Sequence, residues 1–361
     1  MSILFEPKAI GNLVLKNRFI KSSTAESMAG PNGEVTPPML EFYESISRGG
    51  AACIFLGHAF VHPEGRAHAK MTGIHEDRLI PGLKDLADVI HRHECCVFAQ
   101  LNHGGSRVQA GFAEPVGPSP IPHPLTGALP RELSSSEIWE IVDSFGRAAI
   151  RAREAGLDGV LIHGGHGYLA SLFASPLTNR RTDEWGDKPR LLEEIYRSIR
   201  TAVGSDFPVA VKLGVKDDSE GGLSVEDGAS VAAILAKIGV DAIEVSGGIP
   251  TKEAGAGRRD ILSRDQEAYF LPDAKAIRPE VGPLPLSLVG GLRSPQLMEE
   301  IVMAGWVDFV SLARPFICEP DLVVKIRAGR WDPVSCTSCE RCRAGFAQED
   351  LRCRRDEEPP T

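Results

Sequence analysis

Two imidazoles and a phenol lie close together in the segment His163-Gly164-Gly165-His166-Gly167-Tyr168. The segment follows an apolar run, Gly159-Val160-Leu161-Ile162, which predicts a buried strand. Glycines let the backbone turn tightly after such a strand. Imidazoles can hold a substrate oxygen and a phenol can give up a proton. The pattern therefore indicates a proton-handling site, a metal site or a structural turn, and its candidate residues are His163, His166 and Tyr168.

A lysine also interrupts an apolar run, in Val209-Ala210-Val211-Lys212-Leu213. A cation inside an apolar strand is costly unless an anion or a dipole meets it. Lys212 is then a Schiff-base lysine, as in aldolase barrels, or a cation that stabilises negative charge on a bound ring. A solvated strand end is the third interpretation.

Two glycine- and arginine-containing turns suggest a phosphate site. Gly290-Gly291 follows one predicted strand and Ala313-Arg314 follows the last one. Barrels commonly hold phosphate in the loops after strands 7 and 8. The glycine backbone can approach a phosphate closely, Ser294-Pro295 then opens a helix with its positive end, and Arg314 can add a bidentate contact. A tight turn beside a surface arginine is the alternative.

The elements that must position these residues alternate between short apolar strands and longer amphipathic helices. The strands are predicted at 18–23, 51–57, 95–101, 159–163, 209–213, 242–246, 286–290 and 309–312. The helices are predicted at 38–48, 80–93, 135–155, 191–203, 225–238, 265–277, 295–304 and 320–328. Eight strand–helix units predict an α/β protein with a (β/α)8 TIM-barrel fold, with a doubly wound sheet as the alternative.

Composition excludes several classes of partner. The chain has 361 residues, of which 42% are hydrophobic and 25% charged, and a formal net charge of −9. This charge argues against nucleic acid or an anionic membrane as a partner. The first residues show neither the basic start nor the apolar stretch of a signal peptide, so we expect a cytoplasmic protein with a small-molecule substrate.

Half of the eight cysteines crowd the end of the chain, at Cys336, Cys339, Cys342 and Cys353. In a reducing compartment such a cluster suggests a metal rather than disulfides. The options are an iron–sulfur cluster, a zinc site or free thiols. We therefore divide the chain into a (β/α)8 barrel at 1–329 and a Cys-rich tail at 330–361. Cys318 and the remaining cysteines are expected to be small core residues.

The residues resemble the Old Yellow Enzyme family of FMN-dependent ene-reductases, from Leu4-Phe5-Glu6-Pro7 to about Arg314. Gln100-Leu101-Asn102-His103-Gly104-Gly105 is similar to the family's Gln-Leu-x-His-x-Gly segment. The most specific likeness is His163-x-x-His166-Gly167-Tyr168-Leu169, followed by Phe173-x-Ser175-Pro176-x-x-Asn179-x-Arg181-x-Asp183.

This resemblance implies one bound FMN with its ring over the barrel mouth. Gln100 would hydrogen-bond the pyrimidine edge, and Lys212 would stabilise the reduced anionic ring, where much of the family has arginine. The other positions implied to contact the cofactor are Ser22, Ser23, Thr24, Ala25 and His58 at the ring and Gly290, Gly291, Ala313 and Arg314 at the phosphate. Ala25 stands where relatives often have Cys or Thr, which tune the flavin potential through a contact to the ring. That tuning is absent here unless Thr24 substitutes.

The resemblance also implies the chemistry. His163 and His166 would bind the substrate's carbonyl oxygen, flavin N5 would deliver hydride to the β-carbon, and Tyr168 would protonate the α-carbon. NAD(P)H would reduce the flavin in the same pocket, which agrees with the lack of a Gly-x-Gly-x-x-Gly motif that opens a helix after a strand. The expected enzyme is an NAD(P)H-dependent ene-reductase that forms homodimers by family analogy. The alternatives are an FMN-dependent amine dehydrogenase or demethylase, and a Schiff-base lyase that uses Lys212.

The Cys-rich tail is similar, with spacing shortened by one, to the iron–sulfur segment that follows the barrel in multidomain relatives such as dienoyl-CoA reductases. If iron is present, a redox partner protein or an external donor must exchange electrons with it. Arg341, Arg343, Arg354 and Arg355 could attract an acidic partner, or they could keep the tail soluble.

Overall fold

The computed structural model describes residues 2–109, 111–252 and 257–357. Its central sheet has nine strands, of which β5 (Thr72–Gly73) is a short addition beside β4. The other eight pair in parallel and close on themselves, because β3 pairs with both β13 and β4. These eight strands are β3 (Phe19–Lys21), β4 (Cys53–Phe60), β6 (Cys96–Asn102), β9 (Gly159–Gly164), β10 (Val209–Gly214), β11 (Ala242–Ser246), β12 (Leu286–Leu288) and β13 (Phe309–Leu312). The closure confirms the predicted TIM barrel and rules out an open, doubly wound sheet.

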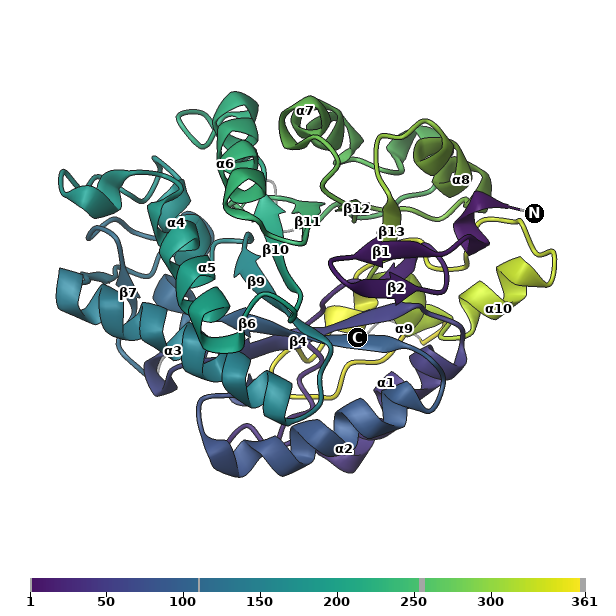
Figure 1. Cartoon of the computed structure of the whole chain (residues 1–361), viewed down its shortest axis with the longest axis horizontal. Coiled ribbons are helices and arrows are strands. Elements are labelled where there is room, and N and C mark those ends of the chain that lie inside the picture. The colour runs from purple at the N-terminus through teal and green to yellow at the C-terminus, as the bar shows by residue number, and fades with distance from the viewer. Residues whose placement is uncertain (1, 110, 253–256, 358–361) are drawn as a thin grey trace.

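Helices surround this barrel, as Figure 1 shows. The long ones are α1 (Pro37–Arg48), α2 (Ile80–His91), α3 (Ser135–Glu154), α5 (Arg190–Val203), α6 (Val225–Ile238), α7 (Leu271–Val281) and α8 (Pro295–Met303). Shorter ones are α4 (Leu169–Ala174), α9 (Arg314–Cys318) and α10 (Leu322–Arg327). A capping box begins α3, since the side chains of Ser134 and Glu137 each bond to the other's backbone N–H.

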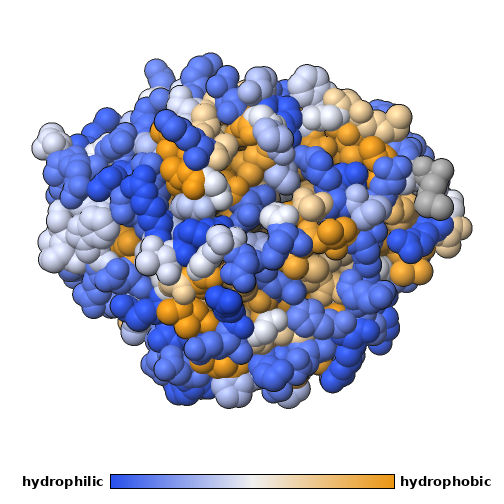
Figure 2. All heavy atoms as spheres, in the orientation of Figure 1, coloured by the Kyte–Doolittle hydropathy of each residue, from blue (hydrophilic) through white to orange (hydrophobic). Residues whose placement is uncertain are grey.

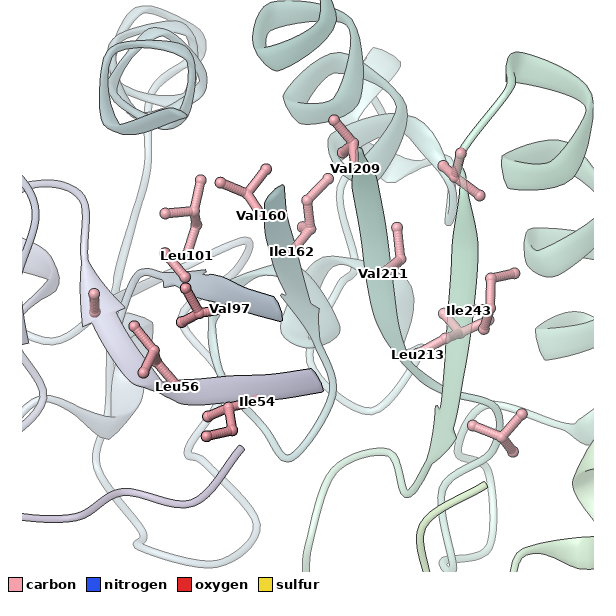
Figure 3. Close-up of a cluster of buried hydrophobic side chains, with 14 of the residues drawn as sticks. Ile54, Leu56, Val97, Leu101, Val160, Ile162, Val209, Val211, Leu213 and Ile243 are labelled. Atoms are coloured by element: carbon pink, nitrogen blue, oxygen red, sulfur yellow. The ribbon is translucent and has the colours of Figure 1, made fainter. Parts of the chain in front are cut away.

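Each barrel strand is buried on both faces, and its residues alternate between them. The outward-facing set packs against the helices, and Figure 3 shows it as a layer of aliphatic side chains that includes Val209, Val211 and Leu213 of β10. Neighbouring strands contribute Val160 and Ile162 in the same way. A strand covered on both faces needs a nearly continuous apolar sequence. This explains why continuous apolar segments, rather than alternating apolar and polar residues, predicted these strands.

The inward-facing residues at the amino-terminal end of the barrel form a separate apolar cluster. It contains three phenylalanines, Phe55, Phe98 and Phe309, and the rings of Phe55 and Phe98 lie 5.4 Å apart. An antiparallel hairpin of β1 (Lys8–Ile10) and β2 (Leu13–Leu15), which lies across the barrel in Figure 1, adds apolar side chains to this cluster. The amino-terminal end is therefore filled and closed, and only the opposite end can hold a ligand.

The predicted element boundaries differ from the structure mainly in two places. The helix predicted at 265–277 is instead a 3-10 turn, η6 (Arg264–Gln266), followed by α7, which continues through Pro279. The strand predicted to end at Gly57 continues to Phe60 as β4. The hairpin β1–β2, the helices α4 and α9, and a small pair of strands, β7 (Val116–Gly117) with β8 (Arg131–Glu132), were not predicted.

The surface in Figure 2 is mostly hydrophilic, with hydrophobic residues interspersed between the charged ones. Within the described residues, no helix combines the length and the hydropathy that crossing a membrane would need.

Candidate active site

A cleft opens at the carboxyl ends of the barrel strands, where TIM barrels hold their active sites. Counted with its open mouth, the cleft contains about 1340 Å³ of empty space. All the barrel residues that the sequence singled out line it: Ser22, Ser23, Thr24, Ala25, His58, Gln100, His163, His166, Tyr168, Lys212, Gly290, Gly291, Ala313 and Arg314. The fold therefore brings together residues from seven of the eight barrel strands or the loops after them.

The floor of the cleft follows from strand periodicity. On β6, Phe98 belongs to the apolar plug and Gln100, two residues later, lines the cleft. The pairs Leu161–His163 on β9 and Ala210–Lys212 on β10 repeat this arrangement. Because side chains two positions apart in a strand share a face, each strand presents first an apolar and then a polar group to the barrel interior.

Strand β4 reaches the same arrangement through a bulge. Phe55 pairs with Phe98 but His58, rather than Gly57, pairs with Gln100, so β4 has one extra residue. Gly57 occupies the bulge, where its N–H donates to the Tyr43 hydroxyl at 2.7 Å and an added Cβ would lie 1.5 Å from the Glu26 carboxylate. The bulge turns His58 into the cleft, and only glycine fits beside it.

The histidines of the cleft are held as neutral imidazoles. Burial lowers the pKa of His163 well below its ordinary value, and the nearby His166 and His58 lower it further. Burial likewise lowers the pKa of His166, with added repulsion from Lys212 and Arg107. The rings of His163 and His166 lie 5.4 Å apart, and His166 Nε2 is 2.8 Å from the Ser246 hydroxyl. Neutral imidazoles can donate an N–H to a substrate oxygen without bringing a full charge.

Tyr168 lies against this pair. Its ring is 4.9 Å from the ring of His163 and 4.9 Å from that of His58. The residue is 8% exposed, and its hydroxyl has no hydrogen-bond partner within the described residues. A phenol that packs among imidazoles and keeps its hydroxyl available at a cleft can act as a proton donor.

Lys212 is paired with an anion, as expected for a buried positive charge. Its ammonium forms an ion pair with Glu244 on the adjacent strand β11 and donates to the Ser22 hydroxyl at 3.1 Å. The side chains of Lys212 and Glu244 are 2% and 0% exposed. Because the Lys212 nitrogen is held between Glu244 and Ser22, the geometry does not suit a Schiff-base lysine.

A second buried lysine lies beneath the first. Lys21 donates to the Ser22 carbonyl at 2.6 Å, and burial lowers its pKa to about 8 against the opposing attraction of Glu26 and Glu244. Glu26 accepts from the Thr72 hydroxyl at 2.8 Å, and burial raises the pKa of its carboxyl. Two lysines and two glutamates thus form a charged layer below the cleft.

The floor of the cleft retains polar groups that the protein does not satisfy. Gln100 Nε2 and Ser23 Oγ are buried without a hydrogen-bond partner within the described residues. Buried donors and acceptors left unpaired are costly, so such groups point to a polar ligand. An FMN ring, whose pyrimidine edge carries carbonyl and N–H groups, fits donors of this kind next to the Lys212 cation.

The two glycines at the other end of the cleft adopt conformations that favour glycine. Gly290 has a φ of 135° and Gly291 a φ of 73°. A Cβ on Gly291 would lie 2.9 Å from the Tyr269 ring. These positions leave backbone groups open to a phosphate, and Arg314 lines the same cleft with its guanidinium 3.6 Å from Glu340.

We expected the positive end of helix α8 to face a phosphate, and the structure differs from this expectation. The backbone N–H groups of Arg293 and of the N-cap Ser294, just before the helix, donate to the Glu267 carboxylate at 2.7 and 2.8 Å. The Ser294 hydroxyl donates to the same carboxylate at 2.5 Å. A carboxylate of the protein therefore already binds the residues that lead into this helix.

The Cys-rich tail forms part of the cleft. The Leu351 N–H donates to the Glu26 carbonyl at 2.9 Å, and the Phe346 ring lies 5.0 Å from the ring of His68. Cys342, Arg343 and Phe346 line the cleft beside the barrel residues. The tail is therefore packed on the barrel and encloses the ligand site.

The four cysteines of the tail line a smaller cavity next to the cleft. A fifth, Cys318, lines it too, with its sulfur 3.8 Å from an Arg355 nitrogen, so the expectation of a core residue was wrong for Cys318. Burial raises the pKa of Cys336 and raises that of Cys342 to about 11. The thiols suit a soft metal by type, but among the described residues no three metal-binding side chains converge on one ion. The metal site stays a prediction.

Several residues of the cleft were missed by the sequence reasoning. Glu244 and Ser246 lie on β11, where the sequence Ala-Ile-Glu-Val-Ser carries a carboxylate inside an apolar strand, the same signal that drew attention to Lys212. Arg107 follows the strand β6 in a loop that was considered only for its histidine and glycines. Tyr269 and Phe346 come from long connections and gave no signal, because their positions depend on how those segments fold.

Comparison with known proteins agrees with this geometry. The chain is 34% identical over 361 residues to an NADH oxidase of Thermoanaerobacter brockii, covering 97% of this chain and 55% of that protein. A 2-naphthoyl-CoA reductase in complex with 2-naphthoyl-CoA superposes with a TM-score of 0.90 at 28% identity, over 97% of this chain and 56% of that one. An old yellow enzyme homologue from Zymomonas mobilis gives a TM-score of 0.78 at 25% identity, over 91% and 94% of the two chains.

The chain spans about half the length of the curated relatives that it matches first. The NADH:flavin oxidoreductase / NADH oxidase family matches residues 3–332, which include the whole barrel and exclude the tail cysteines. With this match, the closed barrel and a cleft lined by all the expected residues, the chain belongs to the NADH:flavin oxidoreductase / NADH oxidase family, the family of the old yellow enzymes.

Proposed function

We propose that the protein is an FMN-dependent oxidoreductase that uses NAD(P)H to reduce an activated C=C bond in an enone-type substrate. The observation that carries the proposal is the group of two neutral imidazoles and a phenol at the cleft, with His163 4.9 Å from Tyr168 and 5.4 Å from His166 between ring centroids. An enone needs two groups of this kind, one to polarise its carbonyl oxygen and one to protonate carbon.

The chain's own residues would hold FMN through three sets of contacts. Gln100 and Ser23 offer unpaired polar atoms to the ring, and Lys212 offers a cation. Gly290, Gly291 and Arg314 offer backbone groups and a guanidinium to the phosphate. When bound, FMN supplies the hydride that the β-carbon of the substrate receives.

The protein then does the work of polarisation and proton transfer. His163 and His166 donate hydrogen bonds to the carbonyl oxygen, which stabilises the negative charge that develops there. Tyr168 gives its hydroxyl proton to the α-carbon. Because the pKa values of both imidazoles are lowered, the pair stays neutral at neutral pH and does not protonate the oxygen outright.

Visible absorption of the purified protein is the first test. We expect a flavin band that bleaches anaerobically with NADH or NADPH and returns when an enone is added. A colourless protein that takes up no FMN would contradict the proposal. Reduced protein that is reoxidised by an amine-derived imine but by no enone would instead support the amine dehydrogenase.

Substitution of the phenol tests the assigned roles. Tyr168→Phe removes the proton donor and keeps the ring, so enone reduction should fall by about 100-fold or more, which is the usual contribution of a general acid. Bleaching of the flavin by NAD(P)H should be unchanged, and this half-reaction serves as the control. Unchanged enone reduction would remove Tyr168 as the required donor.

We also propose that the tail cysteines bind a metal, as an iron–sulfur cluster or zinc. The proposal is supported by four thiols, Cys336, Cys339, Cys342 and Cys353, that line one cavity. Metal analysis of anaerobically purified protein should find iron with sulfide, or zinc, and Cys339→Ser should reduce that content. The buried Cys53, far from the tail in the barrel plug, provides the matched control as Cys53→Ser. Equal metal content in the wild type and Cys339→Ser would contradict a cysteine-ligated site.

A further inference from the structure

Arg107 is a cation of the cleft that the proposed reaction does not use. It ends the 3-10 turn η4 (Gly105–Arg107), which follows β6. Its Nη1 donates to the His166 carbonyl at 2.6 Å, and its guanidinium carbon lies 4.5 Å from the centroid of the Tyr168 ring. These contacts place a permanent positive charge beside both the imidazole pair and the phenol.

Each of the other cations that line the cleft lies near a carboxylate. Lys212 is paired with Glu244, and the guanidinium groups of Arg314 and Arg343 lie 3.6 and 3.8 Å from Glu340. Within the described residues Arg107 has no carboxylate partner, and the His166 carbonyl is the one acceptor that it contacts. A guanidinium has five N–H donors, so most of its hydrogen-bonding capacity is available to a ligand.

The carboxylates of the cleft do not compensate this charge. Glu340 also pairs with Arg259 at 2.8 Å, and Glu349 pairs with Arg354, so both are committed to the tail and its neighbours. The histidines around Arg107 add no negative charge because they are neutral or cationic at any pH. Within the described residues, the positive charge of Arg107 is thus paired with no carboxylate.

We propose that Arg107 binds an anionic group, most simply a carboxylate, carried by the substrate, so that the enzyme prefers anionic unsaturated carbonyl compounds over neutral or cationic ones. This inference rests on the proposed function and adds the substrate class to it. The planar fork of a guanidinium matches the two oxygens of a carboxylate, and within the described residues the Arg107 guanidinium donates only to the His166 carbonyl, through Nη1. A protonated amine would meet a like charge at the same place.

A matched pair of substrates separates this role from a structural one. The acid 6-oxohept-4-enoate carries a carboxylate two methylenes from its C=C bond, and its methyl ester has the same reacting atoms without the charge. Arg107→Met removes the charge and keeps the length that packs on Tyr168, whereas Arg107→Lys keeps the charge. Arg66→Met removes a neighbouring cation that stacks on Phe60 and does not line the cleft, and it controls for long-range electrostatics.

We expect the wild type to favour the acid over the ester in kcat/KM, and Arg107→Met to lose about 10- to 100-fold on the acid alone, the usual loss for a hydrogen-bonded charge contact. Arg107→Lys should restore part of the preference, and Arg66→Met should retain it. An equal loss on acid and ester in Arg107→Met would assign Arg107 to holding the His166–Tyr168 loop and would overturn the inference.

Two further measurements are needed. The first shows whether Arg107 binds an anion of the substrate or the phosphates of the coenzyme. The second separates failure of this inference from failure of the proposed function. Flavin bleaching by NADH, measured without enone, reports on the phosphates of the coenzyme, and a loss confined to this step would overturn a substrate-binding role. Equilibrium binding of the saturated 6-oxoheptanoate and its methyl ester, followed by changes in protein fluorescence, needs no turnover. If neither enone is reduced but the saturated acid still binds in an Arg107-dependent way, the reaction is wrong and the anion site stands. No preference for the saturated acid would overturn it.

Discussion

The interior of this barrel has two levels that are built on the same strands and stabilised in opposite ways. Towards the amino-terminal ends of the strands, Phe98, Leu161 and Ala210 belong to a dry plug. Two residues later on the same strands, Gln100, His163 and Lys212 line the cleft. The lower level gains stability from packing, whereas the upper level consists of polar groups that need partners, and some of those groups, such as Gln100 Nε2, have none in the protein. The comparison shows how one strand can serve the core and the site with a spacing of two residues.

The largest effect is expected from truncating Phe98, the side chain that strand β6 contributes to the apolar plug. Phe98 is fully buried, and its ring packs so closely on Gly159 that a Cβ there would lie 2.4 Å from it. Phe98→Ala should therefore lower the free energy of unfolding by about 3 to 5 kcal/mol. Gln100→Ala should lower it by about 1 kcal/mol or less, because its amide nitrogen has no protein partner to lose, and should weaken FMN binding instead.

Urea unfolding of both variants without FMN, followed by flavin titration, measures this contrast. Equal losses of stability would show that the two levels are not distinct. A Gln100→Ala variant that binds FMN with wild-type affinity would remove Gln100 from the cofactor site.

A smaller effect is expected at the ion pair of the upper level, between Lys212 and Glu244. Glu244→Gln removes the counter-charge of the buried Lys212 ammonium and should cost about 3 kcal/mol of stability, since an uncompensated buried charge remains. The double variant Lys212→Met with Glu244→Leu should recover most of that loss, because two apolar groups of similar size need no pairing.

Thermal or urea unfolding of the single and double variants measures both changes in stability. If the double variant loses as much stability as Glu244→Gln or more, the lysine and glutamate are held by their surroundings rather than by each other. Activity is no guide in this test, because Lys212 lines the cofactor cleft in either case.

The same contrast explains what could be predicted from the sequence. The barrel was readable because strands buried on both faces are continuous apolar runs, and the polar exceptions in those runs, such as Lys212 and His163, mark the upper level. The bounds of β4 were not readable, since its bulge at Gly57 interrupts the pattern and turns His58 inward. The helix predicted at 265–277 was misplaced: its first residues form the turn η6, and α7 continues through Pro279.

The contribution of the tail could not be predicted for a different reason. Its residues reach the cleft through contacts between distant parts of the chain, such as the Ala347 N–H that donates to the Ser27 hydroxyl at 3.2 Å. No local pattern encodes such a contact, so Phe346 and Arg343 gave no sign that they line a flavin site. Arg107 could have been predicted, because a cation soon after a barrel strand lies where active-site residues are expected.

The smallest effect, per unit of pH, is expected from the histidines that surround the upper level. Burial lowers the pKa of His103 to about 3 and lowers that of His68 and His123 to about 4. The unfolded chain takes up these protons near the ordinary value of 6.5, whereas the folded chain does so only at much lower pH. Stability is therefore complete above pH 6.5 and falls as the pH is lowered towards 4, by about 1.4 kcal/mol per pH unit for each such histidine.

Urea midpoints measured between pH 7 and 5 in the wild type and His103→Asn test this slope. His103 accepts a hydrogen bond from the Gly105 N–H at 3.1 Å, and asparagine can supply an acceptor there without titrating in this range. The variant should depend less steeply on pH by about one proton, which is about 1.4 kcal/mol per pH unit. His91, whose pKa is raised by its hydrogen bond to Asp158, is the matched control outside the cleft. Its contribution to stability changes only above the ordinary value of 6.5, so His91→Asn should leave the slope between pH 6.5 and 5 unchanged. Equal slopes in all three proteins would show that acid sensitivity does not arise from the buried imidazoles of the upper level.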